Sequence, residues 1–300
     1  MFKTIIAGSD GQRGRGAASL AQVIATATGA RLLLVGVEHE LPLALIETHS
    51  QVRAATERAL RGVRDRHAPD ADIQIAVDAS PAHALRRMAT DEHADLIVVG
   101  SRTRGPIERL TSSDDAMQVL HGAPCAVAIA PDHLAPCHRL GRIGVGIDST
   151  PESGAALDVA LELARRSGAA LRLLAVAHDV YPGSPEFPAD VPYDDIYREV
   201  LESRSQAARV AVAAALKKCS GVPVSADVQL GDPATALTAL GTECDLLVLG
   251  SRRWGPLRRL ALGSTSERVI RHAACPVLVP PRGAAEEHGD TQHMASTTAC

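Results

Sequence analysis

The residues best suited to chemistry lie near the carboxyl end, where a glycine-containing loop leads into a predicted helix. The loop opens at Gly250, directly after an apolar run, and ends in Gly263-Ser264-Thr265-Ser266. A glycine lets the backbone come close to a ligand, and the first turn of a helix exposes N–H groups that favour anions. The hydroxyls of Ser264 and Ser266 can add donors to phosphate oxygens. This combination is typical of a phosphate site, although the Ser264-x-x-Glu267 spacing also predicts an ordinary capping box.

This segment belongs to the second of two repeated halves. Residues 95–131 align without a gap onto residues 245–281, at a constant offset of 150. Earlier in the chain Asp10 matches Asp148, and Leu32–His39 matches Leu171–His178. The smaller offset there means that the second half carries an insertion, around residues 181–192. A repeat of this length indicates two tandem copies of one domain.

Each half reads as strands that alternate with helices. Aromatic residues are only 2% of the chain, so the cores must be built from Ala, Val, Leu and Ile, which suits buried parallel strands. We therefore expect an α/β fold of two doubly wound domains, each a five-stranded parallel sheet with helices on both faces. The predicted strands are Lys3–Ala7, Arg31–Val37, Asp72–Val77, Asp95–Val99, Ala126–Ile129, Arg142–Ile147, Ala170–Ala177, Val224–Gln229, Asp245–Leu249 and Pro276–Val279, and helices are predicted at Ser153–Ser167 and Ser203–Lys218.

The expected boundaries follow from these elements. The first domain spans residues 1–132, a Pro-containing linker spans 133–141, the second domain spans 142–282, and residues 283–300 form a disordered tail without apolar periodicity. In an open parallel sheet, ligands bind at the carboxyl ends of the strands where the strand order reverses. The loop after the fourth strand of each half is therefore the expected site.

At that loop the sequence resembles the universal stress protein family, whose ATP-binding pattern is Gly, two residues, Gly, nine residues, Gly, then Ser or Thr. The second half matches it at Gly250, Gly263 and Ser264. The acidic residue after the first strand, Asp148, and the turn Gly231-Asp232-Pro233 also agree with the family. The resemblance extends over residues 1–282 and implies a Rossmann-like fold of the adenine nucleotide alpha hydrolase type.

The resemblance implies ATP, with Mg²⁺, as the ligand of the second half. Adenine and ribose would lie near Ile147, Asp148 and Val176, and the phosphates along residues 250–266. Asp148 would hydrogen-bond the ribose or help to hold a metal; its alternative role is to shape the turn before Ser149 and Thr150. The implied binding residues are Ile147, Asp148, Val176, Leu249, Gly250, Arg252, Arg253, Gly263, Ser264, Thr265 and Ser266.

One position departs from the family pattern. Arg253 stands where the second glycine belongs. A side chain there costs about 1–2 kcal/mol if the backbone needs a positive φ, and it can block the approach of a phosphate. Alternatively, the guanidinium reaches a phosphate and replaces backbone contacts with a charged fork.

The first half differs at the same places. Thr103 stands at the second glycine, Ser113 at the third and Asp114 at the hydroxyl position, followed by Asp115. Carboxylates at a helix start complement its dipole, but a like charge about 4 Å from a phosphate costs about 4 kcal/mol at an effective dielectric of 20. We therefore expect a degenerate nucleotide site in the first half.

Composition excludes several other functions. The net charge of −4 with mixed signs predicts no nucleic-acid partner, and no apolar run approaches the length of a membrane span. The amino terminus enters a strand pattern directly, which predicts a cytoplasmic protein. Six cysteines show no CxxC pair, and the segment His133 to His138, which contains Cys137, lacks the second half of a metal site.

Three functional hypotheses remain. No nucleophile, base and orienting residue can be assembled, so we expect a non-enzymatic, stress-response ATP-binding regulatory protein. The alternatives are a protein-interaction module with vestigial pockets, and a slow ATP hydrolase. By resemblance, the two halves would pack through their last strands into an intramolecular pseudo-dimer, and whether the chain pairs again as a homodimer is left open.

Overall fold

The computed structural model of the chain describes residues 2–11, 14–38, 46–101, 114–136, 138–179, 193–251 and 262–281. Within α2, α4 and α6, the side chains of residues 46–49, 114–115 and 193–196 are not described. The insertion at residues 181–192 and the tail at 283–300 fall outside these ranges, so their expected loop and disorder stay predictions.

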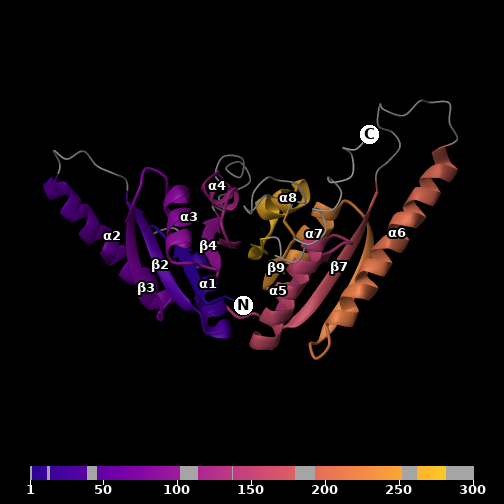
Figure 1. Ribbon diagram of the computed structural model, residues 1–300, viewed down its shortest axis with the longest axis horizontal. Helices are drawn as coiled ribbons and strands as arrows, with labels where there is room; N and C mark the ends of the chain where they lie inside the picture. The colour runs from indigo at the N-terminus through magenta and orange to yellow at the C-terminus, as the bar shows by residue number, and fades with distance from the viewer. Residues whose placement is uncertain are drawn as a thin grey trace, which may run out of the picture.

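Each half contains five parallel strands in the same order (Figure 1). The order is β3-β2-β1-β4-β5 in the first half. Read from its own outer edge inwards, the second half has the matching order β8-β7-β6-β9-β10. The first half consists of β1 (Thr4–Gly8), α1 (Arg15–Thr28), β2 (Arg31–Glu38), α2 (Ile46–His67), β3 (Asp72–Val77), α3 (Pro81–Asp91), β4 (Leu96–Ser101), α4 (Asp114–Leu120) and β5 (Ala126–Pro131). The second half consists of β6 (Arg142–Ile147), α5 (Pro151–Ser167), β7 (Ala170–His178), α6 (Tyr193–Lys218), β8 (Val224–Gly231), α7 (Pro233–Gly241), β9 (Leu246–Val248), α8 (Ser264–His272) and β10 (Val277–Val279).

The two sheets join through their last strands. β10 pairs antiparallel with β5, with Leu278 opposite Ala128, and the result is one ten-stranded sheet. Figure 1 shows the two halves as the arms of a V, with α2 and α6 along the outer sides and β4 and β9 near the middle. The last strands are thus paired as the resemblance implies, and the antiparallel join buries two edges that would otherwise be open.

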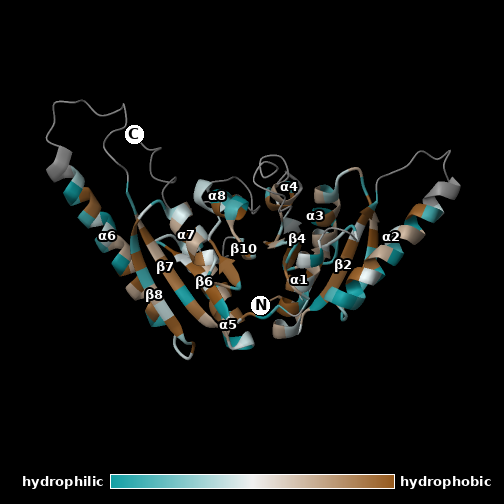
Figure 2. Ribbon diagram, turned by 180° about the vertical axis from the view of Figure 1, so that it is seen from behind, coloured by the Kyte–Doolittle hydropathy of each residue, from teal (hydrophilic) through white to brown (hydrophobic). Residues whose placement is uncertain are grey.

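Helices cover both faces of this sheet. Buried residues of α1, α2, α5 and α6 form one apolar cluster, and those of α3, α4, α7 and α8 form another. Figure 2 shows hydrophobic strands between these helical layers, with hydrophilic residues on the outer sides of α2 and α6. Within the described residues, no helix has the length and apolar character needed to cross a membrane.

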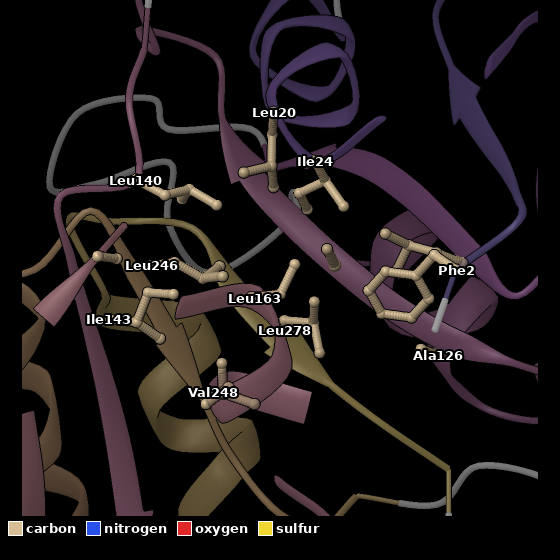
Figure 3. Close-up of a cluster of buried hydrophobic side chains, with 14 of the residues drawn as sticks. Phe2, Leu20, Ile24, Ala126, Leu140, Ile143, Leu163, Leu246, Val248 and Leu278 are labelled. Carbon is tan, nitrogen blue, oxygen red and sulfur yellow. The ribbon is translucent and has the colours of Figure 1, made fainter. Parts of the chain in front are cut away.

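The first cluster crosses the boundary between the halves. Side chains from both halves meet in it, which makes the pair one packed unit rather than two separate bodies. Figure 3 shows Phe2, Leu20, Ile24 and Ala126 from the first half together with Leu140, Ile143, Leu163, Leu246, Val248 and Leu278 from the second.

A repeated aspartate ties the fourth strand of each half to the first. Asp95 Oδ2 accepts hydrogen bonds from the backbone N–H groups of Lys3 and Thr4, at 2.6 and 3.0 Å. Asp245 Oδ2 accepts from those of Gly141 and Arg142, at 2.9 and 2.8 Å. The aspartate of each repeat therefore satisfies donors that a strand start leaves without partners.

The predicted strands agree with the observed ones to within two residues at each end. The main difference is α6, which begins at Tyr193 rather than at residue 203. Tyr193, Ile196, Tyr197, Val200 and Leu201 already recur at three- and four-residue spacing, so the helical pattern of the sequence extends further than the predicted start. Arg204 ties this part of α6 to the sheet by donating to the carbonyl of His178 at 2.8 Å.

Candidate functional site

The candidate site of the second half lies where its strand order reverses. β6 and β9 are adjacent and parallel, but β6 continues to β7 on one side while β9 continues to β10 on the other. The helix after β6, α5, packs on one face of the sheet, and α8, after β9, packs on the opposite face. Their amino termini therefore flank the carboxyl ends of β6 and β9, as expected at a switch point.

Gly250 is the point where these elements come closest. A Cβ added at Gly250 would lie 3.0–3.1 Å from the backbone atoms of Glu152 and Ser153 in the first turn of α5. Glycine is thus required because a side chain would collide with the protein's own backbone. The reason expected from the sequence was different, namely the close approach of a ligand. Glu152 is 7% exposed, so the crevice has a buried acidic residue on the α5 side.

The start of α8 corrects the predicted capping box. The N-cap is Gly263, Ser264 is the first residue of the helix, and the N-cap makes no side-chain hydrogen bond. Glu267 bonds forward to Arg271 at 2.8 Å instead of back to the start of the helix. A capping box needs the hydroxyl residue at the N-cap, and here it is one position too late.

Gly263 has a different environment from Gly250. Its φ is −81°, which any residue adopts, and a Cβ built on it meets no described residue within 4 Å. Neither the backbone conformation nor packing against the described residues therefore requires glycine at this position. The N-cap also offers no side-chain acceptor to the N–H groups of the first turn of α8.

The hydroxyl residues of this turn differ in exposure and in hydrogen bonding. Ser266 is buried and donates a hydrogen bond of 3.0 Å to the carbonyl of Gly250, so its proton is used inside the protein. Ser264 is exposed and Thr265 half-buried. Of the two hydroxyls expected to bind a phosphate, that of Ser264 is exposed, whereas that of Ser266 holds α8 against the end of β9.

Asp148 shapes the turn between β6 and α5. Its Oδ1 accepts from the backbone N–H of Thr150 at 2.8 Å and from the Thr150 hydroxyl at 2.5 Å. The Thr150 hydroxyl in turn caps α5 by accepting from the N–H of Ser153 at 3.2 Å. The turn-forming role is therefore present, and it leaves Oδ2 of this exposed side chain without a partner among the described residues.

The apolar residues expected near the base come from three adjacent strands or strand ends. Ile147 ends β6 and is 6% exposed, Val176 is half-buried on β7, and Leu249 follows β9 at 3% exposed. Ile147 packs in the cluster on the α5 side of the sheet, whereas Val176 and Leu249 pack on the α8 side. Arg252 and Arg253 lie outside the described residues, so the question raised by Arg253 stays open.

The turn Gly231-Asp232-Pro233 has a clear structural role. Gly231 has a φ of +139°, and Asp232 caps α7 by accepting from the N–H of Thr235 at 2.9 Å. Both carboxylate oxygens of Asp232 also accept from the Arg268 guanidinium, at 2.8 and 3.0 Å. These hydrogen bonds, first from Arg268 and then from Thr235, hold the pKa of Asp232 well below its usual range. Asp232 thereby links the start of α7 to α8.

The corresponding crevice of the first half holds a carboxylate that sequence reasoning missed. Asp132 Oδ1 accepts from the N–H of Gly14 at 3.2 Å and would lie 3.0 Å from a Cβ on Gly100. Gly14 is the N-cap of α1, with a φ of +80°. At the repeat offset of 150, the counterpart of Asp132 is Arg282. This difference between the halves is the only sign in the sequence that Asp132 has a role of its own. The side chains of Asp114 and Asp115, and all of Thr103 and Ser113, lie outside the described residues.

Asp78, Ser80 and His83 have the residue types of a catalytic triad but not its geometry. The His83 ring bonds Asp78 at 2.7 Å, while the Ser80 hydroxyl accepts from the backbone N–H of His83 at 3.4 Å. The N–H of Ser80, and then His83, lower the pKa of Asp78. The three residues therefore cap α3. Throughout the described ranges, no group of three His, Cys, Asp or Glu side chains is arranged to hold a metal.

Both halves of the chain match the same family of known proteins. The model of the universal stress protein family matches residues 1–131 and again residues 140–281. A universal stress protein of Mycolicibacterium smegmatis is 28% identical over 230 residues, or 76% of each chain. One of Mycobacterium tuberculosis strain H37Rv is 31% identical over 188 residues, which are 62% of this chain and 61% of that relative, less than two thirds of its length.

Solved structures share the fold. The crystal structure of a universal stress protein from Archaeoglobus fulgidus aligns with a TM-score of 0.66 at 21% identity, covering 93% of this chain and 98% of that one.

Proposed function

Because this chain belongs to the universal stress protein family, with two copies of the domain in tandem, we propose that it is an ATP-binding regulatory protein of the stress response. ATP is held mainly by the crevice of the second half, between the ends of β6 and β9. Binding of the nucleotide changes which partner or conformation the protein favours, rather than starting a reaction.

One observation carries the choice of this crevice. The first turn of α8 begins at a glycine that gives no side-chain cap and that no described residue would contact through a Cβ. A helix start of this kind carries partial positive charge and free N–H donors, which favour a phosphate group. In the family pattern the phosphate-binding glycine stands at the position of Gly263, so the uncapped position and the expected one coincide.

The remaining candidate residues suit the rest of the nucleotide. Asp148 Oδ2 is exposed and can accept hydrogen bonds from ribose hydroxyls, while Oδ1 keeps the turn in shape. Ile147, Val176 and Leu249 are apolar groups for the base. Mg²⁺ bound with ATP would neutralise phosphate charge, and Asp148 is the exposed carboxylate that would share in holding it.

Both crevices contain a carboxylate, but from different elements: Glu152 lies on α5, whereas Asp132 follows β5. In the first half, Asp132 lies beside Gly14 and Gly100, the counterparts of Glu152 and Gly250. A phosphate placed there would meet the like charge of Asp132, and the sequence has two further carboxylates, Asp114 and Asp115, where the second half has Ser264 and Thr265. For the first half alone, this favours the second candidate function, an interaction domain with a vestigial pocket.

Calorimetric titration of the full chain with Mg-ATP tests the proposal. Ser264→Asp places a carboxylate on the first turn of α8, where it stabilises the helix but repels phosphate, so we expect ATP binding to be lost while thermal stability is kept. Ser264→Ala is the matched control, because it keeps the backbone N–H groups and adds no charge; it should retain most of the affinity. Equal ATP affinity in Ser264→Asp and wild type would refute the proposal.

A further inference from the structure

A second feature suited to anions lies in the first half, on the outer side of α1 and α2. A hollow of about 130 Å³ opens between the start of α1 and the carboxyl-terminal half of α2. Its lining includes Gly11, Arg15, Arg58, Gly62, Arg66 and His67, and no acidic residue. Three guanidinium groups and an imidazole therefore border one small depression.

These arginines lack the partners that balance charge elsewhere on α2. Arg61 pairs with Glu57 and Arg64 with Asp65, each at 2.8 Å. Within the described ranges, Arg15 and Arg66 make no ion pair, and Arg58 only donates to the carbonyl of Ala54 in its own helix, at 3.2 Å. Glu57 and Asp65 are thus engaged by arginines that do not line the hollow, and Arg15, Arg58 and Arg66 have no carboxylate partner among the described residues.

Two further facts show that this charge is concentrated. Arg15 is the first residue of α1, at the positive end of the helix dipole, and the first turn contains no acidic residue. His67 is fixed by a hydrogen bond of 2.9 Å between its Nδ1 and the Ser19 hydroxyl. Burial, and then the charges of Arg15 and Arg66, lower the pKa of His67. The positive charge of the two arginines therefore reaches His67.

The glycines keep the hollow open. Gly11 has a φ of +88°, and a Cβ there would lie 2.4 Å from the Cβ of Ala59, so the loop runs tightly against α2. Gly62 lies inside α2, where glycine lowers helix propensity, yet a Cβ built on it meets no described residue within 4 Å. Packing against the described residues therefore gives no reason for Gly62, whereas access to the hollow does.

We propose that this hollow binds a small phosphate-bearing anion, held by Arg15, Arg58 and Arg66. Guanidinium groups recognise phosphate oxygens through paired N–H donors, which suits such a ligand better than a single carboxylate. The hollow is independent of the ATP crevice because it shares no residue with it. The second half has no arginine at the position of Arg15. When Asp10 is aligned with Asp148, the counterpart of Arg15 is Ser153, whose hydroxyl accepts a hydrogen bond from the N–H of Asp148.

Calorimetry with inorganic pyrophosphate tests this site on the full chain. Because pyrophosphate can also enter the ATP crevice, all proteins carry Ser264→Asp. We expect Arg15→Gln with Arg66→Gln to weaken binding by about tenfold or more. The matched control, Arg61→Gln with Arg64→Gln, removes the same amount of charge from positions on α2 that do not line the hollow, and it should change the affinity less than twofold.

A variant that leaves every charge in place separates the hollow from general attraction. Gly62→Leu improves the helix propensity of α2 and fills the opening, so the protein should stay folded and lose pyrophosphate binding. Equal weakening by both arginine pairs would mean diffuse attraction, and full binding by Gly62→Leu would mean another location. Either result, or an absence of binding to the parent protein, overturns the proposal.

Discussion

The hydroxyl of Ser266 donates a hydrogen bond of 3.0 Å to the carbonyl oxygen of Gly250, and this contact fastens the first turn of α8 to the end of β9. Gly250 in turn approaches the backbone of α5 so closely that a Cβ would lie 3.0 Å from the carbonyl carbon of Glu152. The crevice is therefore built by three elements that hold one another. A Cβ on Gly263, in contrast, would contact none of the residues that the structure describes.

This contrast predicts different effects of the same substitution at the two glycines. Gly250→Ala should destabilise the protein by about 1–3 kcal/mol, because the added methyl group meets backbone that cannot move aside easily. Gly263→Ala should change stability by only about 0.5 kcal/mol, since the weaker N-cap and the stiffer unfolded chain offset each other. Urea unfolding of both variants checks the pair, and equal losses at both positions would contradict the assigned roles.

Asp232 predicts a defined pH dependence. Its folded pKa is lowered, mainly by Arg268, so the stability it contributes is present above the unfolded pKa of about 3.9 and is lost as the pH falls through the folded value. Asp232→Asn keeps a capping side chain but loses the charge. The variant should be less stable than wild type near pH 7 by up to about 1 kcal/mol, a small value because the side chains of Asp232 and Arg268 are 35% and 57% exposed.

The difference between Asp232→Asn and wild type should then shrink as the pH falls below about 4, because the unfolded wild-type chain binds a proton at Asp232 while the folded carboxylate, with its lowered pKa, stays ionised. Urea unfolding at several pH values measures it. A difference that stays constant down to pH 2 would show that the ion pair with Arg268 does not contribute.

Three buried thiols should be chemically inert in the native protein. Burial raises the pKa of Cys125 and Cys275 to about 12 and that of Cys244 to about 11, so almost no thiolate exists near pH 8. Alkylation with iodoacetamide, followed by peptide mass spectrometry, should leave all three unmodified in buffer and modify them in urea. Rapid native labelling of any of the three would contradict this burial.

The order of strands and helices could be predicted because it depends on local sequence patterns that occur in both halves of the chain. Apolar runs such as residues 96–99 and 246–249 predict buried strands, and the common offset predicts that both halves share one topology. The predicted start of α6 was too late, because apolar residues at helical spacing already begin at Tyr193 and continue through Ile196, Tyr197, Val200 and Leu201. The antiparallel join of β5 and β10 came from the family resemblance and not from any pattern in those strands.

The candidate site could be predicted in position but not in detail. A Ser-x-x-Glu spacing does not tell which residue is the N-cap, and a shift of one residue turned the expected capping serine, Ser264, into the first helical residue. Asp132 reaches Gly14 across 118 positions of sequence, and the arginines of the hollow converge only through the packing of α1 on α2. Such contacts depend on the tertiary structure, so no local pattern indicates them.

The central claim is that the glycine-opened start of α8 binds ATP while its counterpart in the first half does not. The most direct measurement is calorimetric titration of Mg-ATP into Gly263→Asp and into Ser113→Asp, the same change at the matching repeat position. The account predicts one ATP per wild-type chain, loss of binding in Gly263→Asp with equal or higher thermal stability because Asp is a favourable N-cap, and unchanged binding in Ser113→Asp. Retained binding in Gly263→Asp, or its loss in Ser113→Asp, would contradict it.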